Sequence, residues 1–199
     1  DAADRLHRLG IRRVGSYAWR DLDDAEAGGS ELHADEIFRR WAAVGVDIRR
    51  PRPDGQVTVE AGIEHAVGVV VGRSSDEPRE FERHGYRVIQ RGGRYDVFAR
   101  VALRQLVRRR PADTATIAIW NCVPWFGPVW APRRRAVWMH HVHREMWDDA
   151  LPTPLNHAGR FVETRLAPLC YRRSTFATLS DSSAEEIRAI GIPAEHLTV

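Results

Sequence analysis

The stretch DDAEAGGSELHADEIFRRW, residues 23–41, decides the fold. A hydrophobic segment at 11–19 predicts a strand before it, and an amphipathic helix is predicted over 30–44, with Ser30 as its N-cap. Gly28 and Gly29 lie at the junction, where glycine lets a ligand approach the main chain and the helix start favours phosphate. The pair does not form the G-x-G-x-x-G fingerprint of dinucleotide-binding proteins, so an ordinary capped loop remains the alternative.

The rest of the chain alternates between strand and helix patterns. Further strands are predicted at 46–50, 56–60, 65–72, 86–90, 114–121, 135–141, 174–180 and 196–199, and further helices at 76–85, 95–110, 157–173 and 182–191. The first helix should bury Leu32, Ile37, Phe38, Trp41 and Val44, and the last should be capped by Ser182 or Ser183. We therefore predict an α/β fold, a Rossmann-like parallel sheet flanked by helices.

Length and composition narrow the class of protein. The 199 residues suit one domain, and 43% hydrophobic with 29% charged residues is typical of a globular protein. No apolar run is long enough to cross a bilayer, and two cysteines make a disulfide framework improbable, so we expect a cytoplasmic protein. All 30 basic residues are arginines, and their scattered runs suggest solvated faces, or contact with phosphates or the inner membrane face, rather than nucleic acid.

Two more stretches follow predicted strands and therefore belong at the same sheet edge. HHVHREMW, residues 140–147, offers histidines for general-base catalysis, substrate binding or a metal, with His157 as a remote fourth metal ligand. Neighbouring strand residues point to opposite faces, so His140 and His141 should not converge and we expect no metal. LSDSSAEE, residues 179–186, is a helix-capping pattern in which Ser180 could also face the cleft.

These stretches, in this order, resemble the N-terminal domain of family-4 glycosyltransferases of the GT-B type. The matching segments are EAGGSELHADEIFRRWAAVGVDI (26–48), RGGRYDVF (91–98), VPWFGPVW (123–130), RAVWMHHVHREMW (135–147) and LSDSSAEEIRAIGIPAEHLTV (179–199). The resemblance implies a retaining enzyme of two Rossmann-like domains, and the chain would be the acceptor-side domain. A C-terminal domain would bind the nucleotide-sugar.

The resemblance also assigns roles to residues. The glycine loop would lie beside the donor diphosphate and His140 would contact the transferred sugar, which makes His140 the predicted catalytic residue. The predicted donor- or substrate-binding residues are Gly28, Gly29, Ser30, His141, His143 and Ser180. No cofactor or metal is implied, and the acceptor would be a saccharide, a lipid-linked molecule or a small molecule.

The sequence departs from the family pattern in two ways, and two alternative functions remain open. Segment 49–72 is longer than expected, and the family's Glu-x7-Glu donor motif is not found in these 199 residues, so we expect residues 1–199 alone to transfer little or no sugar. The first alternative is a non-catalytic Rossmann module that binds anions or carbohydrates. The second is a metal-dependent hydrolase that uses the histidine cluster.

Overall fold

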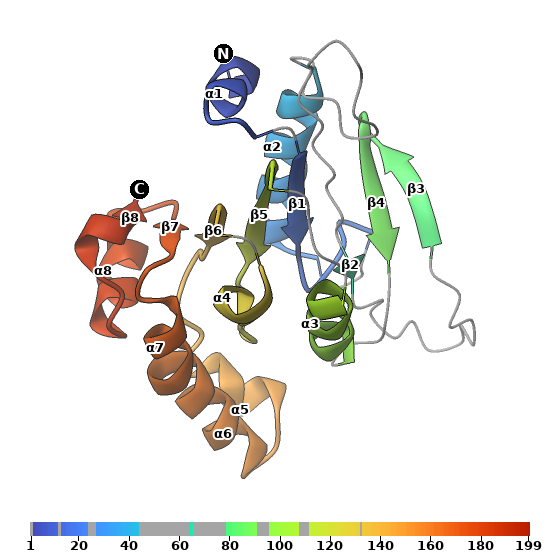
Figure 1. Cartoon of the computed structure of the whole chain (residues 1–199). Helices are drawn as coiled ribbons and strands as arrows, with labels where there is room; N and C mark the ends of the chain where they lie inside the picture. The colour runs from blue at the N-terminus through green and yellow to red at the C-terminus, as the bar shows by residue number, and fades with distance from the viewer. Residues whose placement is uncertain are drawn as a thin grey trace.

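A five-stranded parallel sheet forms the centre of the chain in the computed structural model (Figure 1). The structure describes residues 2–11, 13–23, 27–43, 64–65, 79–90, 96–107, 112–131 and 133–199. The strands lie in the order β1 (Arg13–Tyr17), β5 (Thr114–Ile119), β6 (Arg135–Trp138), β7 (Thr175–Ala177) and β8 (Leu197–Thr198). All four neighbouring pairs are parallel, and the predicted Rossmann-like α/β fold is confirmed.

A second sheet lies on the other side of β1 from β5 (Figure 1). Its order is β2 (Glu64–His65), β4 (Tyr86–Gln90) and β3 (Arg79–Arg83). The prediction of a helix over 76–85 is wrong, because β3 pairs antiparallel with β4 across a turn at His84 and Gly85. Both turn residues have positive φ, 47° and 85°, as a two-residue hairpin turn requires. The strands predicted at 46–50 and 56–60, and most of that at 65–72, lie outside the described residues.

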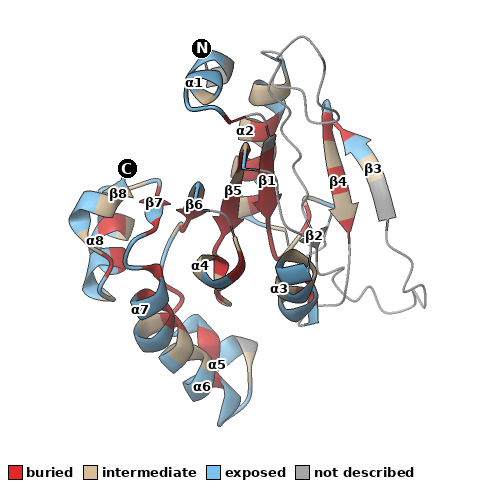
Figure 2. Ribbon diagram, in the orientation of Figure 1, coloured by how far each residue is buried: buried red, intermediate tan, exposed pale blue. Residues whose placement is uncertain are grey.

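Helices cover both faces of the central sheet, so its middle strands are buried (Figure 2). Helix α2 (Gly29–Ala43) packs Ala34 and Phe38 against Val14, Ile117 and Trp138 on one face. Helix α3 (Asp96–Val107) and the short α4 (Gly127–Trp130) pack against Tyr17 and Ala118 on the other. Alternate residues of β1 and β5 thus point into two different cores, as in any parallel sheet that has helices on both faces.

The remaining helices follow β6 or lie at the amino end. They are α1 (Ala2–Arg8), α5 (Met146–Ala150), α6 (Leu155–Phe161), a π-helical turn (Val162–Leu166), α7 (Ala167–Tyr171), α8 (Asp181–Ala189) and a 3-10 turn (Ala194–His196). The helix predicted at 157–173 is present as the continuous run from α6 to α7. Its buried residues include Glu163 and Tyr171, whereas Leu166 and Leu169 are exposed. Among the described residues, no helix is both long and apolar enough to cross a membrane.

Two helix starts differ from the predictions. Helix α2 begins at Gly29, so Gly28 occupies the N-cap position that we had predicted for Ser30. Leu32, which we had predicted on the buried apolar face, is 61% exposed, and Val44 of the same predicted face lies outside the described residues. Helix α8 is capped by Ser180, not by Ser182 or Ser183, since the Ser180 hydroxyl accepts a hydrogen bond from the Ser183 N–H. Both helices start earlier in the chain than predicted.

Candidate functional site

The carboxyl ends of β1, β5 and β6 form one rim of the central sheet. From β1 the chain crosses to the second sheet, and it returns to the central sheet as β5 on the opposite side of β1 (Figure 1). In open parallel sheets, ligands bind outside the carboxyl ends of the strands at such a switch point. The start of α2, Asn121 and His140 all follow these strands and form the candidate site.

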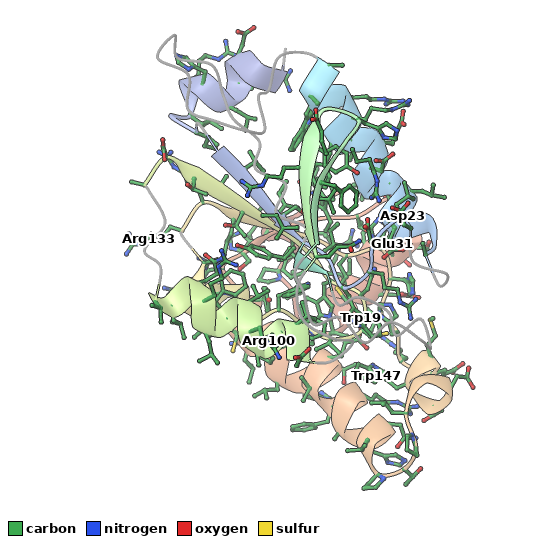
Figure 3. All side chains as sticks on the ribbon, turned by 90° about the vertical axis from the view of Figure 1, so that its right-hand side faces the viewer. Trp19, Asp23, Glu31, Arg100, Arg133 and Trp147 are labelled. Carbon is green, nitrogen blue, oxygen red and sulfur yellow. The ribbon has the colours of Figure 1, made fainter. Side chains whose placement is uncertain are left out.

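The start of α2 is held by a buried carboxylate. Glu31, 6% exposed, accepts the Gly28 N–H at 2.8 Å and the Ser30 hydroxyl at 2.9 Å (Glu31 is labelled in Figure 3). A glutamate that reaches back from the third helical residue to the N-cap amide forms half of a capping box. Glu31 was not predicted from the sequence, although its spacing from Gly28 is the signal of that motif.

Nothing in the described chain requires glycine at the start of α2. A Cβ on Gly29 would meet no atom within 4 Å, and a Cβ on Gly28 would only make an ordinary contact at 3.8 Å with Glu31. Neither residue has the positive φ that favours glycine. No described residue therefore fills the space over the first turn, and the first N–H groups of a helix have no partner within the helix itself.

Asn121 ties this helix start to the end of β5. Its side-chain amide donates to Ser30 Oγ at 2.7 Å and to Glu31 Oε1 at 3.1 Å. The two ends of these contacts lie about 90 residues apart in the chain, and no local pattern in the sequence predicts them. A polar residue directly after the buried strand was the available signal. The start of α2 is thus fixed to β5 by hydrogen bonds.

His140, the predicted catalytic residue, pairs with a residue that the sequence analysis missed. Its Nε2 lies 3.1 Å from Nδ1 of His33, which belongs to α2 and is one turn after Gly29. The two rings meet edge to face with centroids 5.1 Å apart, and the His33 ring also packs on Trp138. The structure therefore connects the ends of β1 and β6, because His33 and His140 bridge the helix after β1 to the residue after β6.

The two histidines are neutral near pH 7. Burial, and then the charges of His33, His141 and His143, lower the pKa of His140 from 6.5 to about 4. Burial also lowers the pKa of His33. A neutral pair can share one N–H between the two rings, whereas two imidazolium rings would repel each other. His140 Nδ1 is enclosed and has no hydrogen-bond partner in the described part of the chain.

His143 belongs to a different, fully enclosed network. Glu163, 0% exposed, lies 2.9 Å from His143 Nδ1 and accepts the Trp147 indole N–H at 2.8 Å (Trp147 is labelled in Figure 3). The Cys122 amide nitrogen lies 3.1 Å from the same Nδ1. This network joins the ends of β5 and β6 to the π-helical turn, so its contacts are structural.

The predicted residues His141 and Ser180 make no hydrogen bond with the His33–His140 pair in the described part of the chain. His141 lies at the surface, and partial desolvation followed by the charge of His143 lowers its pKa. The Ser180 hydroxyl is engaged at the start of α8 with Ser183. Across the described ranges, no three His, Cys, Asp or Glu side chains are grouped so that they could hold a metal ion.

Cys122 does not offer a nucleophile at neutral pH. Its side chain is buried, and burial followed by the nearby Glu163 charge raises the pKa of the thiol to about 12. Its backbone has a positive φ of 56° at the turn that leaves β5. The residue therefore contributes to the shape of the turn.

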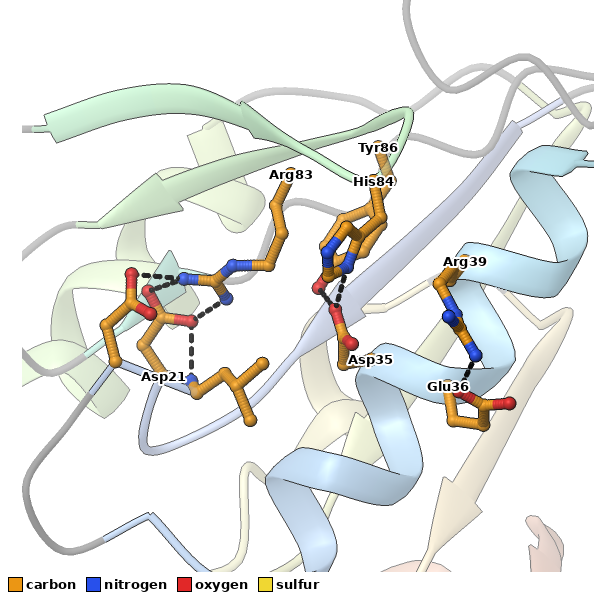
Figure 4. Close-up of polar contacts among 9 residues, drawn as sticks. Asp21, Asp35, Glu36, Arg39, Arg83, His84 and Tyr86 are labelled. Atoms are coloured by element: carbon orange, nitrogen blue, oxygen red, sulfur yellow. Dashed lines mark hydrogen bonds and ion pairs between the residues drawn. The ribbon is translucent and has the colours of Figure 1, made fainter.

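An ion network next to the rim connects the second sheet to the end of β1. Arg83 of β3 donates to both carboxylate oxygens of buried Asp21, and to Asp23 at 2.5 Å (Figure 4). Gln90 adds a hydrogen bond to Asp21 at 2.6 Å. In the same view Tyr86 and His84 both reach Asp35 of α2. The hairpin is thereby attached to the segment after β1 and to α2.

Comparisons with known proteins found distantly similar solved structures. No protein-family model matches this chain, and no curated protein matches it. One similar solved structure is described as trehalose-6-phosphate from E. coli bound with UDP-2-fluoro glucose, at 10% identity over 89% of this chain, with a TM-score of 0.48. Another is the apo structure of OtsA, at 11% identity over 90% of this chain, with a TM-score of 0.46. This chain spans 42% of the length of each of the two, and likenesses this distant carry no argument about the reaction.

Proposed function

We propose that this chain is the acceptor-side half of a GT-B glycosyltransferase, which transfers a sugar from a nucleotide-sugar to an acceptor hydroxyl. One observation carries the proposal. The open, glycine-lined start of α2 and His140 come from distant parts of the sequence and are linked at one rim, through Asn121 to Ser30 and through His140 to His33. The sequence resemblance assigns these same stretches to the donor diphosphate and the transferred sugar.

The chemistry of the site suits the departure of a nucleoside diphosphate. Negative charge develops on the leaving phosphate while the sugar centre becomes positive. Free N–H groups at the helix start, together with the positive end of the helix dipole, stabilise that charge without rearrangement. Gly28 and Gly29 leave room for the phosphates to approach the main chain. Because the His140–His33 pair is neutral, it would act through hydrogen bonds and not as an imidazolium acid.

Retention of configuration, the acceptor and any contact with a membrane rest on the resemblance and on the arginine content alone. In this proposal residues 1–199 bind ligand weakly and need a donor-binding domain for turnover. The alternative, a binding module without catalysis, predicts tight binding of a saccharide or anion by residues 1–199 themselves. Isothermal titration calorimetry with UDP-glucose, glucose and inorganic phosphate separates the two.

The transfer assay uses residues 1–199 joined to a donor-binding domain, with a panel of nucleotide-sugars and acceptors. We expect both variants to reduce kcat at least about tenfold, His140→Ala because it removes the hydrogen-bond partner of His33 and Gly29→Val because it fills the space over the helix start. Leu32→Ala on the exposed side of α2 serves as the matched control. Full transfer by both site variants would exclude this site.

A further inference from the structure

The His33–His140 pair leaves one ring nitrogen for a ligand, and it belongs to His33. His140 Nε2 is occupied by the contact with His33 Nδ1, and His140 Nδ1 is enclosed. His33 is half-buried, and its second nitrogen, Nε2, is neither enclosed nor bonded to any other described residue. The residue predicted as catalytic from the sequence therefore presents no free nitrogen in this conformation.

The enclosed nitrogen of His140 decides which atom carries each proton. Buried N–H groups without an acceptor are rarer in proteins than buried acceptors without a donor. We therefore place the His140 proton on Nε2, where it is donated to His33 Nδ1, and leave Nδ1 unprotonated. A neutral imidazole carries one proton, so the His33 proton is on Nε2. The pair thus forms a chain of two donors that ends in an accessible N–H.

His33 lies on the same face of α2 as the open space over Gly29. Residues four apart on a helix are neighbours, with Cβ atoms about 5–6 Å apart. A Cβ on Gly29 would meet no described atom within 4 Å, so a ligand seated over the first turn would lie on the same helix face as His33. Packing of the His33 ring on Trp138, with centroids 5.4 Å apart, holds the ring on this side.

We infer that His33 is a further substrate-contacting residue of this site, whose Nε2–H donates a hydrogen bond to a ligand oxygen, and that His140 is the positioning residue that fixes its tautomer. The inference rests on the proposed function for the identity of the ligand. A phosphate oxygen and a sugar hydroxyl are both acceptors for this N–H. The titrations below distinguish a phosphate oxygen from a sugar hydroxyl as the acceptor.

The first measurement reads the tautomers directly. Two-bond proton–nitrogen NMR spectra of the ¹⁵N-histidine-labelled chain at pH 7.5 report which ring nitrogen carries the proton, and single variants assign the signals. We expect both His33 and His140 to be protonated at Nε2. His140→Phe should release His33 into a mixture of tautomers, and His140→Gln, whose amide can still donate, should restore one form. A proton on His140 Nδ1, or a single His33 tautomer in His140→Phe, overturns the inference.

The second measurement adds ligands. We titrate labelled residues 1–199, joined to the donor-binding domain used in the transfer assay, with UDP, inorganic pyrophosphate and glucose in separate experiments. A saturable shift of the His33 Nε2 signal with UDP and pyrophosphate assigns the contact to phosphate, and a shift with glucose alone assigns it to a sugar hydroxyl. His33→Phe keeps the packing on Trp138. It should lower the affinity for the probe that shifts the His33 signal about 5- to 10-fold, the worth of one hydrogen bond. His33→Asn should recover part of that loss.

Absence of a saturable shift at His33 with all three probes overturns the inference. This failure is distinct from that of the proposed function. Ligand binding at His33 without transfer by the chain joined to its donor domain would sink the transferase proposal alone. Transfer that is unchanged in His33→Phe would sink this inference alone.

Discussion

Two helical glycines, Gly159 in α6 and Gly29 in α2, are explained in different ways. A Cβ on Gly159 would lie 2.9 Å from Trp147 Cδ2 and closer still to two other ring carbons, so the tryptophan needs glycine there. A Cβ on Gly29 would meet no atom. Packing therefore accounts for the first glycine and leaves the second without a reason inside the described chain. At Gly159 the Trp147 ring occupies the place of a side chain, whereas at Gly29 that place is left for a ligand in the proposed function.

The largest effect should come from the residue that anchors Trp147 over Gly159. Glu163→Leu removes the acceptor for the Trp147 indole N–H and the partner of His143 inside the protein. We expect the free energy of unfolding to fall by about 3–5 kcal/mol, because several buried hydrogen-bonding groups lose their partner at once. Urea denaturation followed by tryptophan fluorescence measures it.

Glu163→Gln is the matched control, because its amide oxygen still accepts one hydrogen bond. It should cost less than about 2 kcal/mol. Equal losses for the two variants would show that shape, and not hydrogen bonding, holds the tryptophan.

Gly159→Ala tests the packing side of the comparison. Alanine is the better helix former by about 1 kcal/mol, but its methyl group must displace the buried Trp147 ring. We expect a net destabilisation of about 1–2 kcal/mol in the same denaturation experiment. A variant more stable than the parent chain would mean that the ring moves aside at little cost, and the glycine would lose its explanation.

The strands of the central sheet could be predicted from the sequence more fully than the contacts of the candidate site, because strands and helix caps leave local sequence patterns. Buried strands such as 114–119 carry apolar runs that can be read directly. The strand at 86–90 was predicted correctly, but the strand at 79–83 was mistaken for a helix because its charged residues hide a period of two, although the following His84–Gly85 turn gave a signal.

The candidate site depends on contacts between distant residues. Gly28, Gly29 and His140 were predicted, but their partners Asn121 and His33 were not. Contacts such as that between His33 and His140 span 107 residues, and they exist only after the strands are ordered side by side. The division of the histidine cluster into the rim residue His140 and the enclosed His143 has the same cause.

Acid should lower the stability of the chain through His140 at the rim. The pKa of His140 is lowered from 6.5 to about 4, so between these pH values the unfolded chain binds a proton that the folded chain does not. Stability contributed at this residue is therefore intact above pH 6.5 and falls as the pH decreases towards 4. Allowing for partial exposure, we expect a loss of about 1 kcal/mol between pH 7.5 and pH 5.

Urea denaturation at the two pH values measures this loss. His140→Gln should reduce it, because glutamine does not titrate, whereas the lowered pKa values of His33 and His141 leave a remainder. His157→Gln, at an exposed histidine, should leave it unchanged. An identical pH dependence in His140→Gln and the parent chain would contradict the assignment.

Gly29→Ala should give the smallest change in stability and the clearest change in function. The new methyl group enters open space in the first turn of a helix, so we expect the free energy of unfolding to stay the same or rise by up to about 0.5 kcal/mol. Gly191→Ala is the contrasting control, because its φ of 102° penalises a side chain and the variant should lose about 1 kcal/mol.

The same methyl group would occupy the space through which a ligand reaches the N–H groups of α2. In the proposed enzyme, Gly29→Ala should therefore weaken UDP binding and reduce transfer while the protein remains fully folded. Circular dichroism and calorimetry on one sample measure both quantities. A stable variant with unimpaired binding would show that the start of α2 is an ordinary helix cap, since neither packing nor ligand would then need glycine at this position.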